Sequence, residues 1–187
     1  MKKHITYLNE LHACGEAIEW VESFPTLQKG WDKCERGDWM LWLLGKQSGK
    51  SGSQSRKKLV LTACKCARLA LKYVPKNEKR PLKAIQTAEK WGGGDSSISL
   101  ADVKNAYVAA SAYADAADAD DAAYAADAAA YAAYAAADAA YAAYAAAYAA
   151  YAAADAAYAA DAAAIINKVL KQCADIVRED YPKIRIK

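Results

Sequence analysis

The amino-acid sequence predicts an all-α protein, a multi-helix bundle with a long helical region rich in Ala, Tyr and Asp. Three observations predict this class. Between residues 122 and 164 the chain uses only those three residue types, and the stretch 99–181 contains neither Pro nor Gly. Alanine has the highest helix propensity, so this stretch favours helix on its own. The segments before it carry helix caps followed by apolar residues at helical spacing.

The first 75 residues predict three helices. Apolar residues recur at helical spacing over 6–23, and a proline follows. Asp38 is placed to cap a short apolar helix at 39–44. Residues 45–55 are rich in Gly, Ser and Lys, which predicts a mobile loop. Ser55 can cap the next helix, at 56–73, and another proline lies beyond its end.

A fourth helix is predicted at 80–91. It begins with Pro81 in its first turn, where the missing N–H costs nothing, and three glycines at 92–94 end it. Ser99 and Asp102 then form a capping-box pattern at the start of the long final region.

The final region is expected to divide into at least two helices packed side by side. One unbroken helix over 122–164 would be about 65 Å long, which is long for a chain of 20.1 kDa. A cluster of aspartates at 115–121 predicts a second helix start, because Asp favours the first turn. A slip in the spacing between Tyr141 and Tyr144 predicts either local overwinding or a turn of the chain.

The Tyr and Asp residues of this region share one stripe of the predicted helices. Successive members are three or four residues apart, which is the spacing of neighbours on one helix face. The stripe consists of Tyr124, Asp127, Tyr131, Tyr134, Asp138, Tyr141, Tyr144, Tyr148, Tyr151, Asp155, Tyr158 and Asp161. Three interpretations are open: a core seam of Tyr–Asp hydrogen bonds, an exposed recognition surface, or the lining of a cavity that stacks a base or a sugar.

A second candidate element lies at the start of the short apolar helix. Trp39 and Trp42 stand on one face of that helix, next to Asp38. They are either core anchors or the stacking wall of a pocket with the carboxylate at its rim. We therefore take Asp38, Trp39 and Trp42 as candidate binding residues, together with the stripe from Tyr124 to Tyr158.

Charge is distributed unevenly along the chain, although the net charge is only +3. Every Lys and Arg lies in 1–104 or 168–187, whereas 105–167 carries only aspartates. The expected organisation is a basic helical body at 1–104 and an acidic Ala-rich region with a C-terminal helix at 105–187, packed together as one domain. The two halves can attract each other within one fold or across a homo-oligomer, or the acidic half can meet a cationic partner. A nucleic-acid partner is not expected.

No catalytic, metal or membrane function is expected. The five cysteines are few and odd in number, which favours reduced thiols in the cytoplasm. His4, His12 and Cys14 could form only a weak metal cluster, and we expect the two histidines to be solvated. The sequence from Gly45 to Ser51 nearly spells a phosphate-binding loop, but one residue is missing between the glycines and no apolar helix follows. Neither a signal peptide nor a membrane span is expected. We predict a non-enzyme without a cofactor.

Several short motifs follow one another in a specific order. They are Gly37-Asp-Trp-Met-Leu-Trp-Leu43, Ala63-Cys-Lys-Cys-Ala67, Val74-Pro75, Arg80-Pro81, Ala84-Ile-Gln-Thr-Ala88, the Ala/Tyr/Asp tract and Cys173-Ala-Asp-Ile-Val-Arg178. In this order, the block from Trp31 to Pro182 resembles a family of alanine-rich, helical immunity proteins encoded by bacteria and their phages. The resemblance implies an all-helical, non-catalytic protein that neutralises a toxin or an immune effector, and it implies no catalytic residues.

Three functions remain as hypotheses. The first is direct binding and blocking of a toxin or immune effector protein. The second is a small-molecule sponge that sequesters a nucleotide-like immune signal in a cavity lined by Tyr, Asp and Trp. The third is a structural, surface-active alanine-rich helix, which the basic and Trp-rich body disfavours.

Overall fold

The computed structural model describes residues 2–117, 119–139, 141–156 and 162–186. Every regular element in these ranges is a helix, which confirms the predicted all-α class. The helices are α1 (Lys3–Glu10), α2 (Gly15–Glu22), α3 (Leu27–Lys33), α4 (Gly37–Gln47), α5 (Gln54–Arg68), η1 (Leu71–Tyr73, a 3₁₀ turn), α6 (Arg80–Gly93), α7 (Leu100–Ala114), α8 (Asp120–Tyr134), α9 (Tyr141–Asp155) and α10 (Ala162–Asp180).

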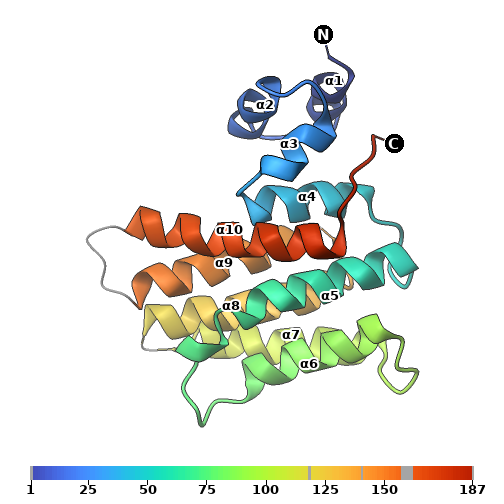
Figure 1. Ribbon diagram of the computed structural model, residues 1–187. Helices are drawn as coiled ribbons and strands as arrows, with labels where there is room; N and C mark the ends of the chain where they lie inside the picture. Colours follow the sequence, from blue (N-terminus) through green and yellow to red (C-terminus); the bar gives the residue numbers. More distant parts are fainter. Residues whose placement is uncertain (1, 118, 140, 157–161, 187) are drawn as a thin grey trace.

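The longer helices pack in two layers (Figure 1). Helix α8 lies between α7 and α9 and contacts both along its length. Helices α4, α5, α6 and α10 lie against this layer and contact α8 or α9. The short helices α1, α2 and α3 stand at one end of the bundle, beyond α4, and the C-terminal tail runs beside them. The Ala-rich tract is therefore part of the bundle itself.

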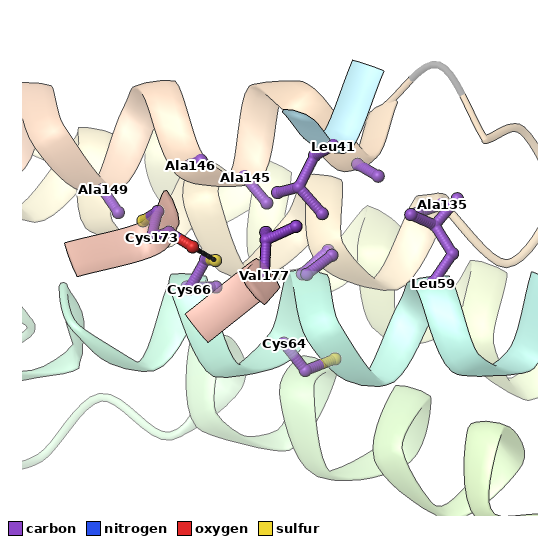
Figure 2. Close-up of a cluster of buried hydrophobic side chains, with 14 of the residues drawn as sticks. Leu41, Leu59, Cys64, Cys66, Ala135, Ala145, Ala146, Ala149, Cys173 and Val177 are labelled. Atoms are coloured by element: carbon purple, nitrogen blue, oxygen red, sulfur yellow. Dashed lines mark hydrogen bonds between the residues drawn. The ribbon is translucent and has the colours of Figure 1, made fainter. Parts of the chain in front are cut away.

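Alanines fill the space between the two layers (Figure 2). Ala145, Ala146 and Ala149 of α9 are buried and face Leu41 of α4 and Val177 of α10, which are also fully buried. The alanine side chain is only a methyl group, so helices that meet through alanines approach closely. Longer side chains, such as Leu41 of α4, Leu59 of α5 and Val177 of α10, then pack onto the alanine layer.

Two glycines of α4 lie at its close contacts with α10 and with the turn before α9. A Cβ atom added to Gly37 would lie 2.7 Å from the backbone nitrogen of Ala174 in α10. One added to Gly45 would lie 2.8 Å from the carbonyl oxygen of Ala139, just before α9. These distances are too short for any side chain, so both crossings require glycine.

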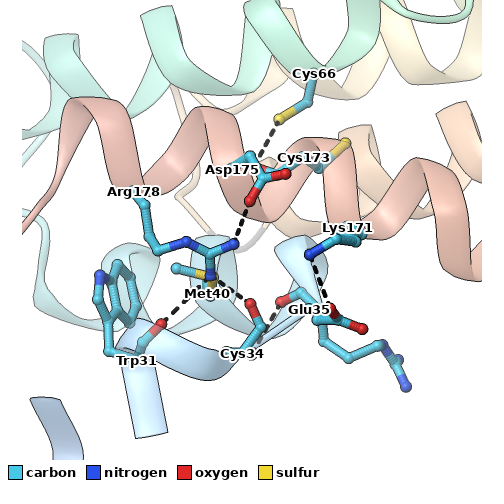
Figure 3. A network of polar contacts seen from close by, with 10 residues as sticks. Trp31, Cys34, Glu35, Met40, Cys66, Lys171, Cys173, Asp175 and Arg178 are labelled. Carbon is cyan, nitrogen blue, oxygen red and sulfur yellow. Dashed lines mark hydrogen bonds and ion pairs between the residues drawn. The ribbon is translucent and has the colours of Figure 1, made fainter. Parts of the chain in front are cut away.

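The end of α10 holds the junction between α3 and α4 (Figure 3). The Arg178 guanidinium donates to the backbone carbonyls of Trp31, at 3.4 Å, and Cys34, and it pairs with Asp175. The Trp31 indole in turn donates to the carbonyl of Tyr181, 2.9 Å away. These bonds fix the position of α4, which carries two of the candidate tryptophans.

One predicted helix is wrong as a single element. The region 6–23 forms two helices, α1 and α2, because the chain turns at His12, which adopts a left-handed φ of 60°. The Ala13 N–H donates to the Leu8 carbonyl at 3.0 Å, which is the bond that closes a Schellman helix end. Glycine is the usual residue at this left-handed position, and because His12 occupies it here, the sequence did not indicate that a helix ends before it.

Other helix boundaries moved by a few residues. Helix α4 extends the predicted 39–44 at both ends, and Asp38 lies inside its first turn rather than capping it. Ser53, not Ser55, caps α5 by accepting a hydrogen bond from the Arg56 N–H. The predicted capping box at Ser99 and Asp102 is present. The loop between α4 and α5 is shorter than the predicted 45–55, and its mobility stays a prediction.

The Ala-rich tract divides as expected, and one division lies close to the predicted place. Helix α8 begins at Asp120, within the aspartate cluster. The turn before α9 precedes Tyr141, whereas the slip in spacing placed it after this residue. Among the described helices, none is both long and apolar enough to cross a membrane.

Candidate binding surface

The tyrosines of α8 and α9 lie outside the alanine layer. Ala128, Ala132 and Ala145 are completely buried, whereas Tyr144 is 51% and Tyr151 is 44% exposed. The remaining tyrosines of the two helices are half-buried: Tyr124, Tyr131, Tyr134, Tyr141 and Tyr148. We call these seven residues the tyrosine face. The helical period therefore separates a methyl-lined inner side from a phenol-lined outer side.

The rings of the tyrosine face touch across the two helices. Tyr131 of α8 is central, with ring-centroid distances of 5.7 Å to Tyr141, 5.5 Å to Tyr144 and 4.9 Å to Tyr148 of α9. Aromatic pairs at such distances contribute about 0.5–1.5 kcal/mol beyond area burial. The face therefore has one feature of the predicted seam, since its rings join α8 to α9, and one of a recognition surface, since it stays partly exposed.

Neighbouring rings extend this cluster in both directions. Tyr124 lies 5.9 Å from Tyr151, near the start of α8. At the other end, Tyr134 lies 4.6 Å from Tyr141 and 4.5 Å from Tyr107 of α7. The result is a continuous row of phenol rings over three helices.

The carboxylates beside the rings experience a low-dielectric and negative environment. Burial, and then the nearby Asp115 carboxylate, raise the pKa of Asp127 to about 6. Burial also raises the pKa of Tyr131, with further contributions from its hydrogen bond with Tyr148 and from the charge of Asp127. At neutral pH this part of the surface carries negative charge that the surroundings do not stabilise.

The other stripe carboxylates mark the helix ends. Asp138 follows the end of α8 and is exposed. Asp155 closes α9 and is exposed near Asp120 and Asp121. These last three carboxylates, together with Tyr124 and Tyr151, line a cavity of about 720 Å³. The predicted stripe members Tyr158 and Asp161 lie outside the described residues.

Arg56 and the loop before α5 hold the end of α8. Arg56 is 9% exposed, and its guanidinium donates to the carbonyls of Ala135, at 3.4 Å, and Ala137, at 3.1 Å. The Ser51 hydroxyl donates to the Ala136 carbonyl at 2.8 Å. These three consecutive carbonyls lie just beyond Tyr134, where α8 has ended, and the two side chains supply the donors that such carbonyls need when they are shielded from water. They fix where α8 stops and thus how Tyr134 and Tyr141 meet.

The second candidate element forms one wall of an apolar groove. The groove has a volume of about 470 Å³ and lies where α1, α2 and α3 meet α4 and α9. We call it the tryptophan groove, because Trp20, Trp31, Trp39 and Trp42 all line it. Trp39 and Trp42 are half-buried and pack on the core as well as lining the groove, and their role as a stacking wall for a ligand stays a prediction.

The charge at the groove rim is already paired. Asp38 accepts hydrogen bonds from Arg36 at 2.9 and 2.7 Å, and the same guanidinium lies 4.3 Å from the centre of the Trp39 ring. The side-chain hydrogen bond to Asp38 is the main reason that the pKa of Arg36 is raised. The Lys46 ammonium lies 5.5 Å from the Trp42 ring. Asp38 therefore offers little free negative charge to a ligand.

Tyr144 joins the two candidate elements. It lines the tryptophan groove beside Trp42, and its ring lies 5.5 Å from that of Tyr131. The structure thus brings Asp38, Trp39 and Trp42 to one end of the tyrosine face. Residues that the sequence did not single out as binding candidates contribute too, namely Trp20, Tyr107 and Arg56. Trp20 and Tyr107 lie outside the repetitive tract, and position 56 entered the sequence analysis only as the start of a predicted helix.

The weak metal cluster that His4, His12 and Cys14 could have formed is not assembled. Among the described residues, no three His, Cys, Asp or Glu side chains gather closely enough to hold a metal ion. His4 is not solvated, as the sequence suggested, but buried in α1, and its Nε2 atom has no hydrogen-bond partner. Cys14 is exposed on the other side of the helix turn.

Comparison with known proteins gives one match. The model of the family described as "Imm-5 like putative immunity protein" matches residues 49–179. This range covers most of the chain, from the loop before α5 to the end of α10, and it contains the whole tyrosine face. It leaves out α1–α4 and therefore the Gly37–Leu43 motif. Neither the curated proteins nor the solved structures contain a match.

Proposed function

The chain belongs to the Imm-5-like immunity protein family, and from this premise we propose that it neutralises a toxin or immune effector protein by direct contact. It acts as a binding protein and not as an enzyme, and it needs no cofactor. The contact is made by the tyrosine face, extended at one end by the tryptophan groove.

The observation that carries this proposal is the outward placement of the tyrosines. The structure builds its interior from alanine and leaves a row of phenol rings half-exposed over α7, α8 and α9. Tyrosine suits protein recognition, because it offers a large, rigid contact area with one polar atom and few rotatable bonds. Aromatic residues are enriched at the energetically dominant positions of protein interfaces. The family match supplies the class of partner.

The alternative is a sponge for a nucleotide-like signal, and the tryptophan groove is where it would bind. Its volume of about 470 Å³ is in the usual range for small-molecule sites. Its described lining, however, contains neither Lys nor Arg, and the Asp38 carboxylate is paired with Arg36. A phosphate-bearing ligand needs cationic or N–H donors. The groove therefore suits an apolar side chain of a protein better than a nucleotide.

The cysteines favour a reducing compartment. Cys64, Cys66 and Cys173 are fully buried, and all five cysteines are free thiols. Burial is the main cause of the raised pKa of Cys64, so this group stays a protonated and unreactive thiol. We propose that the protein works in the cytoplasm, where such thiols remain reduced.

The test is a protection assay with defined toxins. Candidate toxins from the same genome are expressed in a host that each one kills, with and without this chain, and a protecting pair is confirmed with the two purified proteins. Tyr144→Ala and Tyr151→Ala should abolish or strongly weaken protection while the variants stay folded, because both side chains are about half exposed. Tyr73→Ala, which removes a half-buried tyrosine outside the tyrosine face, is the control and should keep protection provided that its melting temperature shows it to be folded.

Two results would overturn the proposal. One is full protection by the Tyr144→Ala and Tyr151→Ala double variant, which would place the contact elsewhere. The other is protection without any complex between the purified proteins. In that case, mass spectrometry of the supernatant from the heat-denatured chain would show whether a small molecule is sequestered instead.

A further inference from the structure

We propose that the tyrosine face docks a basic, arginine-rich surface of the partner protein. This inference rests on the proposed function and adds the chemistry of the partner. The negative charge and the exposed phenol rings of the face together favour a cationic, planar group on the partner. Neither the tryptophan groove nor the acidic cavity at Asp155 takes part in this contact.

The charge of this surface has one sign. Segment 105–167 contains no Lys or Arg, and its described aspartates include Asp115, Asp127 and Asp138. The chain as a whole carries a net charge of +3, so the negative field is local to this side of the molecule. Such a field attracts cationic surfaces, speeds their encounter with the face, and repels nucleic acid.

Among the described residues, neither Asp115 nor Asp127 forms an ion pair with a Lys or Arg side chain. Seven ion pairs between described residues join Arg and Lys to acidic side chains, namely Glu16, Glu35, Asp38, Glu78, Glu89, Asp175 and Asp180. All of these acidic residues lie outside segment 105–167. Two of these pairs, Lys65–Asp180 and Lys171–Glu35, join the two halves of the chain. Asp115 and Asp127, in contrast, repel each other. A cationic partner would relieve this repulsion.

The phenol rings favour guanidinium over ammonium. A planar guanidinium can stack on a ring and at the same time donate paired hydrogen bonds to a carboxylate, which an ammonium cannot do. The molecule already contains such a contact at the edge of this surface, since the guanidinium of Arg80 lies 5.0 Å from the centre of the Tyr113 ring of α7. Tyr131, whose phenol lies close enough to Asp127 to feel its charge, gives the tyrosine face a ring and a carboxylate for a contact of the same kind.

The probe for this inference is an oligo-arginine peptide, with oligo-lysine and oligo-glutamate peptides of equal length for comparison. Binding to the full chain is measured by fluorescence anisotropy at neutral pH over a series of salt concentrations. We expect the arginine peptide to bind more tightly than the lysine peptide, and the glutamate peptide not to bind. Binding should weaken with salt, as expected for exposed charges.

Three variants locate the binding. The Asp115→Asn/Asp127→Asn double variant should weaken arginine-peptide binding about tenfold, which corresponds to about 1.4 kcal/mol. Glu10→Gln/Glu179→Gln removes the same charge from exposed positions outside this surface and should change binding little. Tyr144→Ala should reduce the preference for arginine over lysine. Equal losses in the two double variants, or no preference for arginine, would overturn the inference.

The protection assay separates this inference from the proposed function. If the tyrosine variants lose protection and Asp115→Asn/Asp127→Asn keeps it, the face still binds the toxin but the partner surface is not basic. If neither set loses protection, the proposed function fails as well. A second copy of this chain could also supply the basic surface, and sedimentation of the chain alone at low and high salt tests this. A dimer that dissociates at high salt would show that the face binds a second copy and would overturn the inference.

Discussion

The guanidinium of Arg56 donates a hydrogen bond to the backbone carbonyl of Ala137, 3.1 Å away, and so connects the first turn of α5 to the end of α8. The same group bonds Ser48 Oγ at 3.1 Å and the Gly49 carbonyl at 3.0 Å. Burial lowers the pKa of Arg56, and the charge of Asp138 acts in the opposite direction. A largely buried cation thus links the loop before α5 to the turn that separates α8 from α9.

We expect Arg56→Met to destabilise the fold by about 2–4 kcal/mol, because it leaves several buried carbonyls without a donor. Urea unfolding followed by circular dichroism measures the change. The control is Lys50→Met, an exposed cation in the same loop, which should change stability by less than about 0.5 kcal/mol. Equal stability of Arg56→Met and wild type would show that the α8 end does not depend on this residue.

The glycine at the start of α4 should not tolerate a methyl group. Gly37→Ala places a Cβ atom 2.7 Å from the Ala174 nitrogen, so α4 and α10 must separate. We expect a loss of about 1–3 kcal/mol, the usual cost of overpacking. Gly93→Ala is the matched change in α6, where a Cβ atom meets nothing within 4 Å, and it should leave stability unchanged or raise it. Thermal unfolding of both variants is sufficient.

The tryptophans of the groove should differ in their contribution to stability. Trp31 is 4% exposed and donates a hydrogen bond to Tyr181, so Trp31→Ala should cost about 3–5 kcal/mol. Trp39→Ala and Trp42→Ala should cost less, because both side chains are half-buried. Trp20, at 38% exposure, should contribute least. If the melting temperatures of Trp39→Ala and Trp42→Ala equal that of wild type, these two residues are surface groups only.

Asp127 should make the fold less stable as pH rises. Its pKa is about 6 in the folded protein and 3.8 in the reference state, so the folded state holds the proton more tightly. Its contribution to stability is therefore greatest below about pH 4 and is lost as pH rises through about 6. Asp127→Asn should remove this dependence, so the stability difference between variant and wild type should grow over that window. Urea unfolding across the window measures it, and a folded-state pKa near 4 by NMR would contradict it.

We propose that residues 1–104 and 105–187 unfold together as one domain. The five tryptophans all lie in 1–104, whereas the Ala-rich tract supplies much of the helix signal. Tryptophan fluorescence and far-ultraviolet circular dichroism therefore report on different halves of the chain. Coincident unfolding curves are expected for a single cooperative unit. Two separated transitions would show that the halves are independent domains.

The sequence by itself determined the helical class and much of the detail that depends on local chemistry. The long alanine tract without Pro or Gly favours helix in any context. The capping box at Ser99, the proline at the start of α6 and the aspartates at the start of α8 act on their own turns, so each marked a boundary correctly. The spacing of Tyr and Asp likewise fixed which residues share a face, because the helical period is a local property.

The tertiary structure alone decided which side of that pattern is inside. Alanines and tyrosines recur so regularly that either side of α8 and α9 could have faced the core. The alanine side faces inward because α4, α5 and α10 bring large apolar side chains to it. The position of the turn before Tyr141 was decided by Arg56 and Ser51, which lie about 80 residues away in sequence. The tryptophan groove was also not predictable in full, since five helices meet to form it. Local propensity cannot encode such contacts, because they depend on groups that meet only after the chain has folded.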